Sequence, residues 1–221
     1  MKTVLGSPEK ARTALAMFVV PVGIAAMELL ISESLQIGRF LPLGFLTSVV
    51  PVAGLATGLL CAFLLLRGHI RITRRIVLAY LVLAAAELAA GVVALVLGMG
   101  KYTGGDGGMR LLGDSFLLWL SNILLFAMFY WTLDARLWTT TGQQRPRHFF
   151  YPQHLEKMDG YERWEPGLFA YVYLAFTVST TYGPTDMPAV SAAARLLVML
   201  QALIALILFT LTIARAVAII G

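Results

Sequence analysis

Long apolar runs restrict the fold of this chain more than any other feature. Five of them reach about 20 residues, the length that an α-helix needs to cross the hydrocarbon core of a bilayer. They are residues 14–35, 40–66, 76–99, 111–133 and 190–219. Only 13% of the residues are charged, against about 25% in a typical soluble domain. We therefore predict an all-α polytopic transmembrane bundle, one integral membrane domain over residues 1–221, with the lipid bilayer as its partner.

The basic residues lie in the segments between the apolar runs, which is typical of membrane topology. Nucleic acid is therefore excluded as a partner. On alternate sides of the membrane the segments carry twelve and three basic residues. The richer side holds the N-terminus, residues 67–75 and residues 134–166. The positive-inside rule predicts that this side is cytoplasmic. We thus expect a multi-pass protein of the bacterial cytoplasmic (inner) membrane with its N-terminus in the cytoplasm.

Residues 134–166 mix charges of both signs with aromatic side chains, which is typical of a segment at the membrane interface. His148 and His154 are six residues apart, which is no recognised metal-ligand spacing, and Cys61 is the only cysteine. The chain contains no nucleophile elbow, phosphate-binding loop or zinc motif. We expect no enzyme activity, no catalytic residue, no metal site and no cofactor.

Glu87 lies in the middle of the third run, where a carboxylate costs a few kcal/mol even on lenient insertion scales. Two interpretations stay open: a carboxyl group that handles a proton or cation, or a protonated packing residue. The small residues around it favour close helix approach. Glu28, near the outer end of the first run, is expected to reach the interface. Gly54 and Gly58 form a GxxxG pattern that predicts tight helix contact in the second run.

Two further runs carry polar residues at helical spacing. In the fourth run, Ser115, Trp119 and Asn122 are predicted to share an inward face, with Asn122 in an interhelical hydrogen bond. In the last run, a polar stripe steps by four, three, four and three residues. It comprises Gln201, Ala205, Leu208, Thr212 and Arg215. Arg215 is expected to extend to an interface or, if buried, to neutralise Glu87 or Glu28.

Residues 167–182 form an apolar segment that is shorter than a full span. As a helix, they would extend about 24 Å, against a hydrocarbon core of roughly 30 Å. Either the segment spans a locally thinned bilayer, or it enters part way and turns back. The first alternative puts the C-terminus in the cytoplasm and the second puts it outside.

The end of this segment resembles the pore loop of potassium channels. Six of the nine residues at 177–185 carry hydroxyl groups, beginning with Thr177, and the long last run follows. Potassium channels have a threonine run followed by Val-Gly-Tyr-Gly-Asp, whose carbonyl groups replace the hydration shell of the ion. The resemblance implies a monovalent cation as ligand and these pore or turn residues: Thr180, Thr181, Tyr182, Gly183, Pro184 and Asp186. Thr181 stands where that family has its first glycine.

The chain from the fourth run to its C-terminus also resembles a group of small bacterial integral membrane proteins that are sometimes described as channel-like. The matching residues are Phe176–Thr177, the Pro-Thr-Asp turn at 184–186 and Ala-Arg-Ala-Val at 214–217. This resemblance implies no established activity.

Three functions are consistent with these patterns. The first is a channel-like protein with a pore loop, which would form a homo-oligomer because one loop cannot surround an axis alone. The second is a proton- or ion-coupled secondary transporter that uses Glu87. The third is a non-conducting membrane scaffold or accessory protein.

Overall fold

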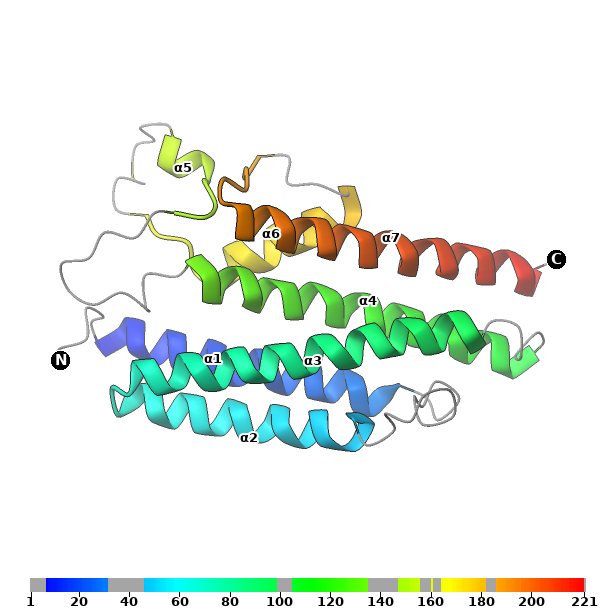
Figure 1. Ribbon diagram of the computed structural model, residues 1–221, viewed down its shortest axis with the longest axis horizontal. Helices are drawn as coiled ribbons and strands as arrows, with labels where there is room; N and C mark the ends of the chain where they lie inside the picture. Colours follow the sequence, from blue (N-terminus) through cyan, green and yellow to red (C-terminus); the bar gives the residue numbers. More distant parts are fainter. Residues whose placement is uncertain are drawn as a thin grey trace.

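The computed structural model describes residues 7–31, 46–98, 105–134, 147–155, 160, 164–181 and 186–220. The helices are α1 (Ser7–Leu30), α2 (Leu46–Leu66), α3 (Ile70–Gly98), α4 (Gly105–Asp134), α5 (Pro152–Leu155), α6 (Leu168–Thr181) and α7 (Ala192–Ile220) (Figure 1). Five of them, α1, α2, α3, α4 and α7, are long and apolar enough to cross a membrane, whereas α6 is a shorter apolar helix. The predicted all-α bundle of five spans and a shorter sixth segment is confirmed, and the chain is a multi-pass integral membrane protein.

The turn between α2 and α3 is shorter than the gap between the second and third apolar runs predicts. Gly68 adopts a positive φ of 81° directly after α2. The N–H of Gly68 donates to Leu65 O at 2.9 Å, and the N–H of His69 donates to Leu64 O at 2.9 Å. This is the Schellman pattern that ends many helices at a glycine. As a result α3 begins at Ile70, and its first turns include the arginines that were expected in a loop.

The GxxxG pattern of α2 packs this helix closely against α1. A Cβ atom at Gly54 would lie 2.9 Å from Pro21 O and 2.9 Å from the Tyr80 hydroxyl of α3. A Cβ atom at Gly58 would lie 3.2 Å from Phe18 O. The predicted tight contact is confirmed, because any larger side chain at Gly54 would force the backbones apart.

Three helix ends meet at one end of the bundle, which we call the Asp134 end. The carboxylate of Asp134, the last residue of α4, accepts hydrogen bonds from the backbone N–H of His148 and from the Tyr171 hydroxyl of α6. His148 O in turn accepts from the N–H of Val190 at 3.0 Å. Nδ1 of the same histidine lies 2.7 Å from the hydroxyl of Ser191, which precedes α7. Both α6 and α7 therefore begin where α4 ends.

The common starting point means that α6 and α7 run in the same direction (Figure 1). Between them the chain returns to the Asp134 end, where residues 148–150 pair with residues 188–190 through an isolated antiparallel bridge at Phe149 and Ala189. Of the two alternatives that the sequence left open, the structure has the one in which the short segment turns back. The N-terminal end of α1 also lies at the Asp134 end, and the C-terminal end of α7 lies at the opposite end (Figure 1).

Candidate functional site

The inner face of α6 is fixed to α4 and α7 by a buried glutamine. The side-chain amide nitrogen of Gln201 donates to Ala175 O at 2.8 Å and to the Ser179 hydroxyl at 3.0 Å. The Tyr130 hydroxyl of α4 donates to the amide oxygen of Gln201. All polar atoms of the Gln201 side chain are thus in hydrogen bonds, although the residue is fully buried. This network joins three helices at one level of the bundle.

The same contacts place the end of α6 deep in the membrane-spanning region. Gln201, which bonds to Ser179, is the tenth residue of the apolar window Ala192–Val217 of α7. Phe176 packs edge-on against Trp119, with ring centroids 6.1 Å apart, and Trp119 lies near the middle of the window Gly108–Asp134. At 14 residues, α6 is about 21 Å long. It therefore starts at the Asp134 end and stops near the middle of the other spans.

The threonines of the predicted pore segment are helical. The hydroxyl of Thr177 donates to Leu174 O at 2.8 Å. The hydroxyls of Thr180 and Thr181 also donate to carbonyls of α6, with Thr181 at 2.7 Å from Thr177 O. Both of these last residues are exposed on the surface of the described structure. A ladder of carbonyl groups in extended backbone would therefore begin after Thr181.

Of the remaining predicted turn residues, the structure describes only Asp186, which is separated from these threonines. Tyr182, Gly183 and Pro184 lie outside the described residues. Asp186 is exposed and lies two residues before Pro188, whose carbonyl accepts a hydrogen bond from the N–H of Phe150 at 3.2 Å. Asp186 thus lies at the Asp134 end, whereas α6 ends at mid-bundle.

A second polar site pairs two acidic residues from different helices. The carboxyl group of Glu28 on α1 is in hydrogen-bonding contact with that of Glu87 on α3. The expectation that Glu28 would reach the interface is therefore wrong. Ionised carboxylates only accept hydrogen bonds, so this contact requires a proton on one of the two groups. The Oε2 atoms of both are buried and have no hydrogen-bond partner.

The common direction of α1 and α3 in the bundle explains why these two residues meet (Figure 1). The Tyr80 hydroxyl of α3 donates to Pro21 O of α1 at 3.4 Å. Glu28 and Glu87 each lie seven residues, or two helical turns, further along their helices. One turn beyond Glu87, α3 also packs closely on α4, since a Cβ atom at Gly91 would lie only 2.9 Å from the Leu118 side chain.

Asn122 is fully buried on α4, one turn beyond Leu118. Neither atom of its side-chain amide has a hydrogen-bond partner. The predicted inward position is confirmed for Asn122 and Ser115, which are both buried, and Trp119 is partly buried. The prediction that Asn122 forms an interhelical hydrogen bond is wrong, because its amide has no partner among the described residues. Ser115 does form one, as it accepts a hydrogen bond from the Thr212 hydroxyl at 2.9 Å.

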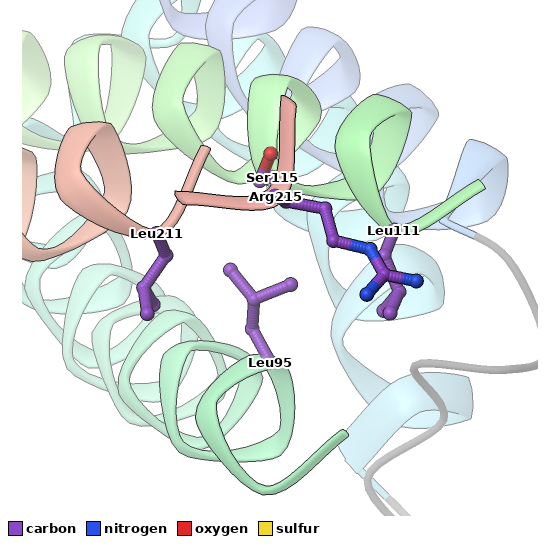
Figure 2. A pocket seen from close by; sticks show the side chains of 5 residues that line it. All are labelled: Leu95, Leu111, Ser115, Leu211 and Arg215. Atoms are coloured by element: carbon purple, nitrogen blue, oxygen red, sulfur yellow. The ribbon is translucent and has the colours of Figure 1, made fainter. Parts of the chain in front are cut away.

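The stripe on α7 is the inner face of that helix, and it ends at a buried arginine. Gln201, Ala205, Leu208 and Arg215 are all buried, and Thr212 is partly buried. Arg215 has 5% of its surface exposed and lines a cavity of about 10 Å³ with Leu95, Leu111, Ser115 and Leu211 (Figure 2). We call this region the Arg215 end.

Arg215 does not neutralise Glu87 or Glu28 as the sequence had suggested. Leu95, which lines the Arg215 cavity, lies eight residues beyond Glu87 on α3, or about 12 Å along the helix. The two polar sites therefore occupy different levels of the bundle. Arg215 is also buried among α3, α4 and α7. The expectation that it reaches an interface stays a prediction.

The chain matches no protein-family model, no curated protein and no solved structure at a significant level of similarity. Within the described parts of the chain, no three His, Cys, Asp or Glu side chains are grouped so that they could hold a metal ion. Sequence reasoning missed Tyr130, Ser179 and the partners of Asp134. These residues stand out in the sequence as polar side chains within or beside apolar segments. Their spacing along the chain does not reveal which helices meet.

Proposed function

We propose that the protein is a channel-like membrane protein that assembles as a homo-oligomer and permeates a monovalent cation. The observation that carries this proposal is the position of the end of α6, with Thr180 and Thr181 exposed near the middle of the membrane-spanning region. The last carbonyl groups of a helix have no partner within the helix. In hydrocarbon such an end must be covered by protein or line a watery cavity. The described residues of one copy of the chain leave Thr180 and Thr181 exposed there.

The electrostatics of α6 favour a cation. The C-terminus of a helix carries a partial negative charge. Half-helix ends of this kind coordinate cations at mid-membrane in other transport proteins. The hydroxyl groups of Thr180 and Thr181 add oxygen atoms at the same level, although each now donates its proton to a carbonyl of α6.

A second copy of the chain is the natural cover for the outer face of α6. Phe169, Tyr173, Phe176 and Thr180 follow steps of four, three and four residues and therefore share one face. Phe169 is 81% exposed. A symmetric assembly around these faces would bring several α6 ends together at one axis, which a single protomer does not provide.

The distribution of basic residues orients this assembly. Under the positive-inside rule the Asp134 end faces the cytoplasm of a bacterial cell. The loop then enters from the cytoplasmic side, opposite to the pore loop of potassium channels that its sequence resembles. No catalytic role is assigned to any residue.

Ion flux and assembly are the direct tests. Purified protein in liposomes is expected to pass monovalent cations, and the double variant Thr180→Val/Thr181→Val is expected to change the flux at least severalfold. Thr210→Val is the matched control, because Thr210 is also an exposed threonine at membrane depth but lies on α7. A monomeric protein without flux, or equal flux in all three proteins, would contradict the proposal.

The Glu28–Glu87 pair favours a second candidate, a proton-coupled secondary transporter. A shared proton between two buried carboxyl groups is a suitable carrier for proton coupling. In this case a pH gradient should drive solute uptake by a monomer, and Glu87→Gln should abolish coupling. If Glu87→Gln leaves all transport unchanged, the pair has a packing role.

A further inference from the structure

The Arg215 end contains a buried cation that forms no ion pair with the described residues. Only 5% of the surface of Arg215 is exposed. No ion pair joins its guanidinium group to a carboxylate of the described residues. The cavity that it lines is otherwise formed by three leucines and Ser115. A charge in such surroundings is unfavourable unless an opposite charge and hydrogen bonds compensate it.

The unpaired atoms of Arg215 have a specific geometry. Nε and Nη2 are both buried and have no hydrogen-bond partner. These two nitrogens lie on one edge of the planar guanidinium, and their N–H bonds are nearly parallel. This edge matches two oxygen atoms of one oxyanion, which is the bidentate arrangement that arginine forms with phosphate and carboxylate.

Ser115 does not supply the missing partner. Its hydroxyl donates to Leu112 O at 2.8 Å and accepts from the Thr212 hydroxyl at 2.9 Å. Thr212 also lies 2.7 Å from Leu208 O. The two hydroxyls thus form hydrogen bonds within and between α4 and α7, and neither of them pairs with the guanidinium edge. A partner for that edge must carry its own negative charge.

The depth of Arg215 indicates what kind of ligand is available. From Ala192, the first residue of α7, to Arg215 the helix rises about 34 Å. The hydrocarbon core is roughly 30 Å thick. If α7 begins at one boundary of the core, Arg215 lies just beyond the other, at the level of lipid headgroups. The cavity of about 10 Å³ has room for about one water-sized atom, so only the tip of a larger group would enter it and the rest would lie outside.

We propose that the Arg215 cavity binds a phosphate group, presented by a phospholipid headgroup or as free phosphate. The Nε–H and Nη2–H groups of Arg215 donate to two of its oxygens. The leucines Leu95, Leu111 and Leu211 exclude water from the contact. The site joins α3, α4 and α7, so its occupation would tighten the end of the bundle that lies opposite α6 (Figure 2).

The test uses the full chain in detergent after delipidation. One arm adds phosphatidylglycerol, and a parallel arm adds a glycolipid that has no phosphate. Another arm adds inorganic phosphate, with sodium chloride at equal ionic strength as its reference. The readouts are the thermal unfolding midpoint and the amount of bound phospholipid in native mass spectrometry. Stabilisation by phosphatidylglycerol alone identifies the lipid as the source, and stabilisation by phosphate over chloride identifies the free anion.

Three variants make the result specific. Arg215→Gln is expected to bind at least about tenfold more weakly, because it loses both charged hydrogen bonds. Arg215→Lys keeps the charge but not the paired donors, and should bind with intermediate affinity. Arg195→Gln is the control, because Arg195 lies on the same helix, is exposed, and donates from Nε to Ala189 O. Equal binding by wild type and Arg215→Gln, equal stabilisation by the phosphate-free glycolipid, or no stabilisation in any arm would overturn the proposal.

Discussion

The hydroxyl of Tyr130 on α4 donates a hydrogen bond to the side-chain oxygen of Gln201 on α7, and the amide nitrogen of that glutamine holds α6. This contact decides where the short helix lies. It keeps α6 inside the bundle, level with the centre of α7, although α6 has too few apolar residues to cross the bilayer. The proposed pore depends on this placement.

Gln201→Leu should detach α6 from its neighbours. The substitution leaves Ala175 O, the Ser179 hydroxyl and the Tyr130 hydroxyl without their present partners. We expect a loss of about 2 kcal/mol in the free energy of unfolding, measured in detergent. Tyr130→Phe removes only one of these bonds and should cost about half as much. Unchanged stability and unchanged amide exchange in α6 for Gln201→Leu would refute this role.

Gly54→Ala and Gly113→Ala should have opposite effects. At Gly54 a Cβ atom would meet Pro21 O and the Tyr80 hydroxyl at 2.9 Å, so we expect a loss of about 1–3 kcal/mol. At Gly113, also within a helix, nothing lies within 4 Å of the new atom. There alanine should stabilise by about 0.5–1 kcal/mol through its helix propensity. Unfolding of the two variants under the same conditions checks the difference, and equal effects would argue against close α1–α2 packing.

The Glu28–Glu87 pair should hold a proton at neutral pH. Infrared spectra of wild-type protein are expected to contain the band of a protonated carboxyl group. The Glu28→Gln/Glu87→Gln double variant should lack that band. Each single glutamine variant should remain folded, since an amide N–H₂ group can donate to the remaining carboxylate. A wild-type spectrum with only ionised carboxylates would rule out the hydrogen-bonded pair.

Asp134→Ala should loosen the start of α6 and the segment at residues 147–151. The carboxylate accepts hydrogen bonds from the His148 N–H and the Tyr171 hydroxyl, and both donors would lose their partner. We expect a loss of about 2 kcal/mol and faster proteolysis in this region. Glu165→Gln provides the contrast. The Glu165 carboxylate lies 3.2 Å from the Arg147 guanidinium, and 41% of the Glu165 side chain is exposed. That exposed pair should contribute less than about 1 kcal/mol.

A topology reporter distinguishes the returning α6 from a crossing one. A reporter inserted at Gly160 and one fused after Gly221 should report opposite sides of the membrane, because α6 and α7 begin at the same end. A reporter at the N-terminus should agree with the one at Gly160. If the reporters at Gly160 and Gly221 indicate the same side, α6 crosses the bilayer.

The sequence by itself determined the bundle of five spans, because a length of about 20 apolar residues is a local property of the chain. It also determined the inner face of α7, since a helix places residues three and four apart on one side. It did not determine that Glu28 meets Glu87, that Gln201 holds α6, or that Arg215 is distant from both acids. These contacts join residues far apart in the chain, and they depend on the direction and register in which whole helices pack. The position of α6 likewise depends on contacts that are distant in the sequence. Its 14 residues set its length, but the hydrogen bonds of Asp134 and Ser191 place the start of α7 at the same end of the bundle as the start of α6.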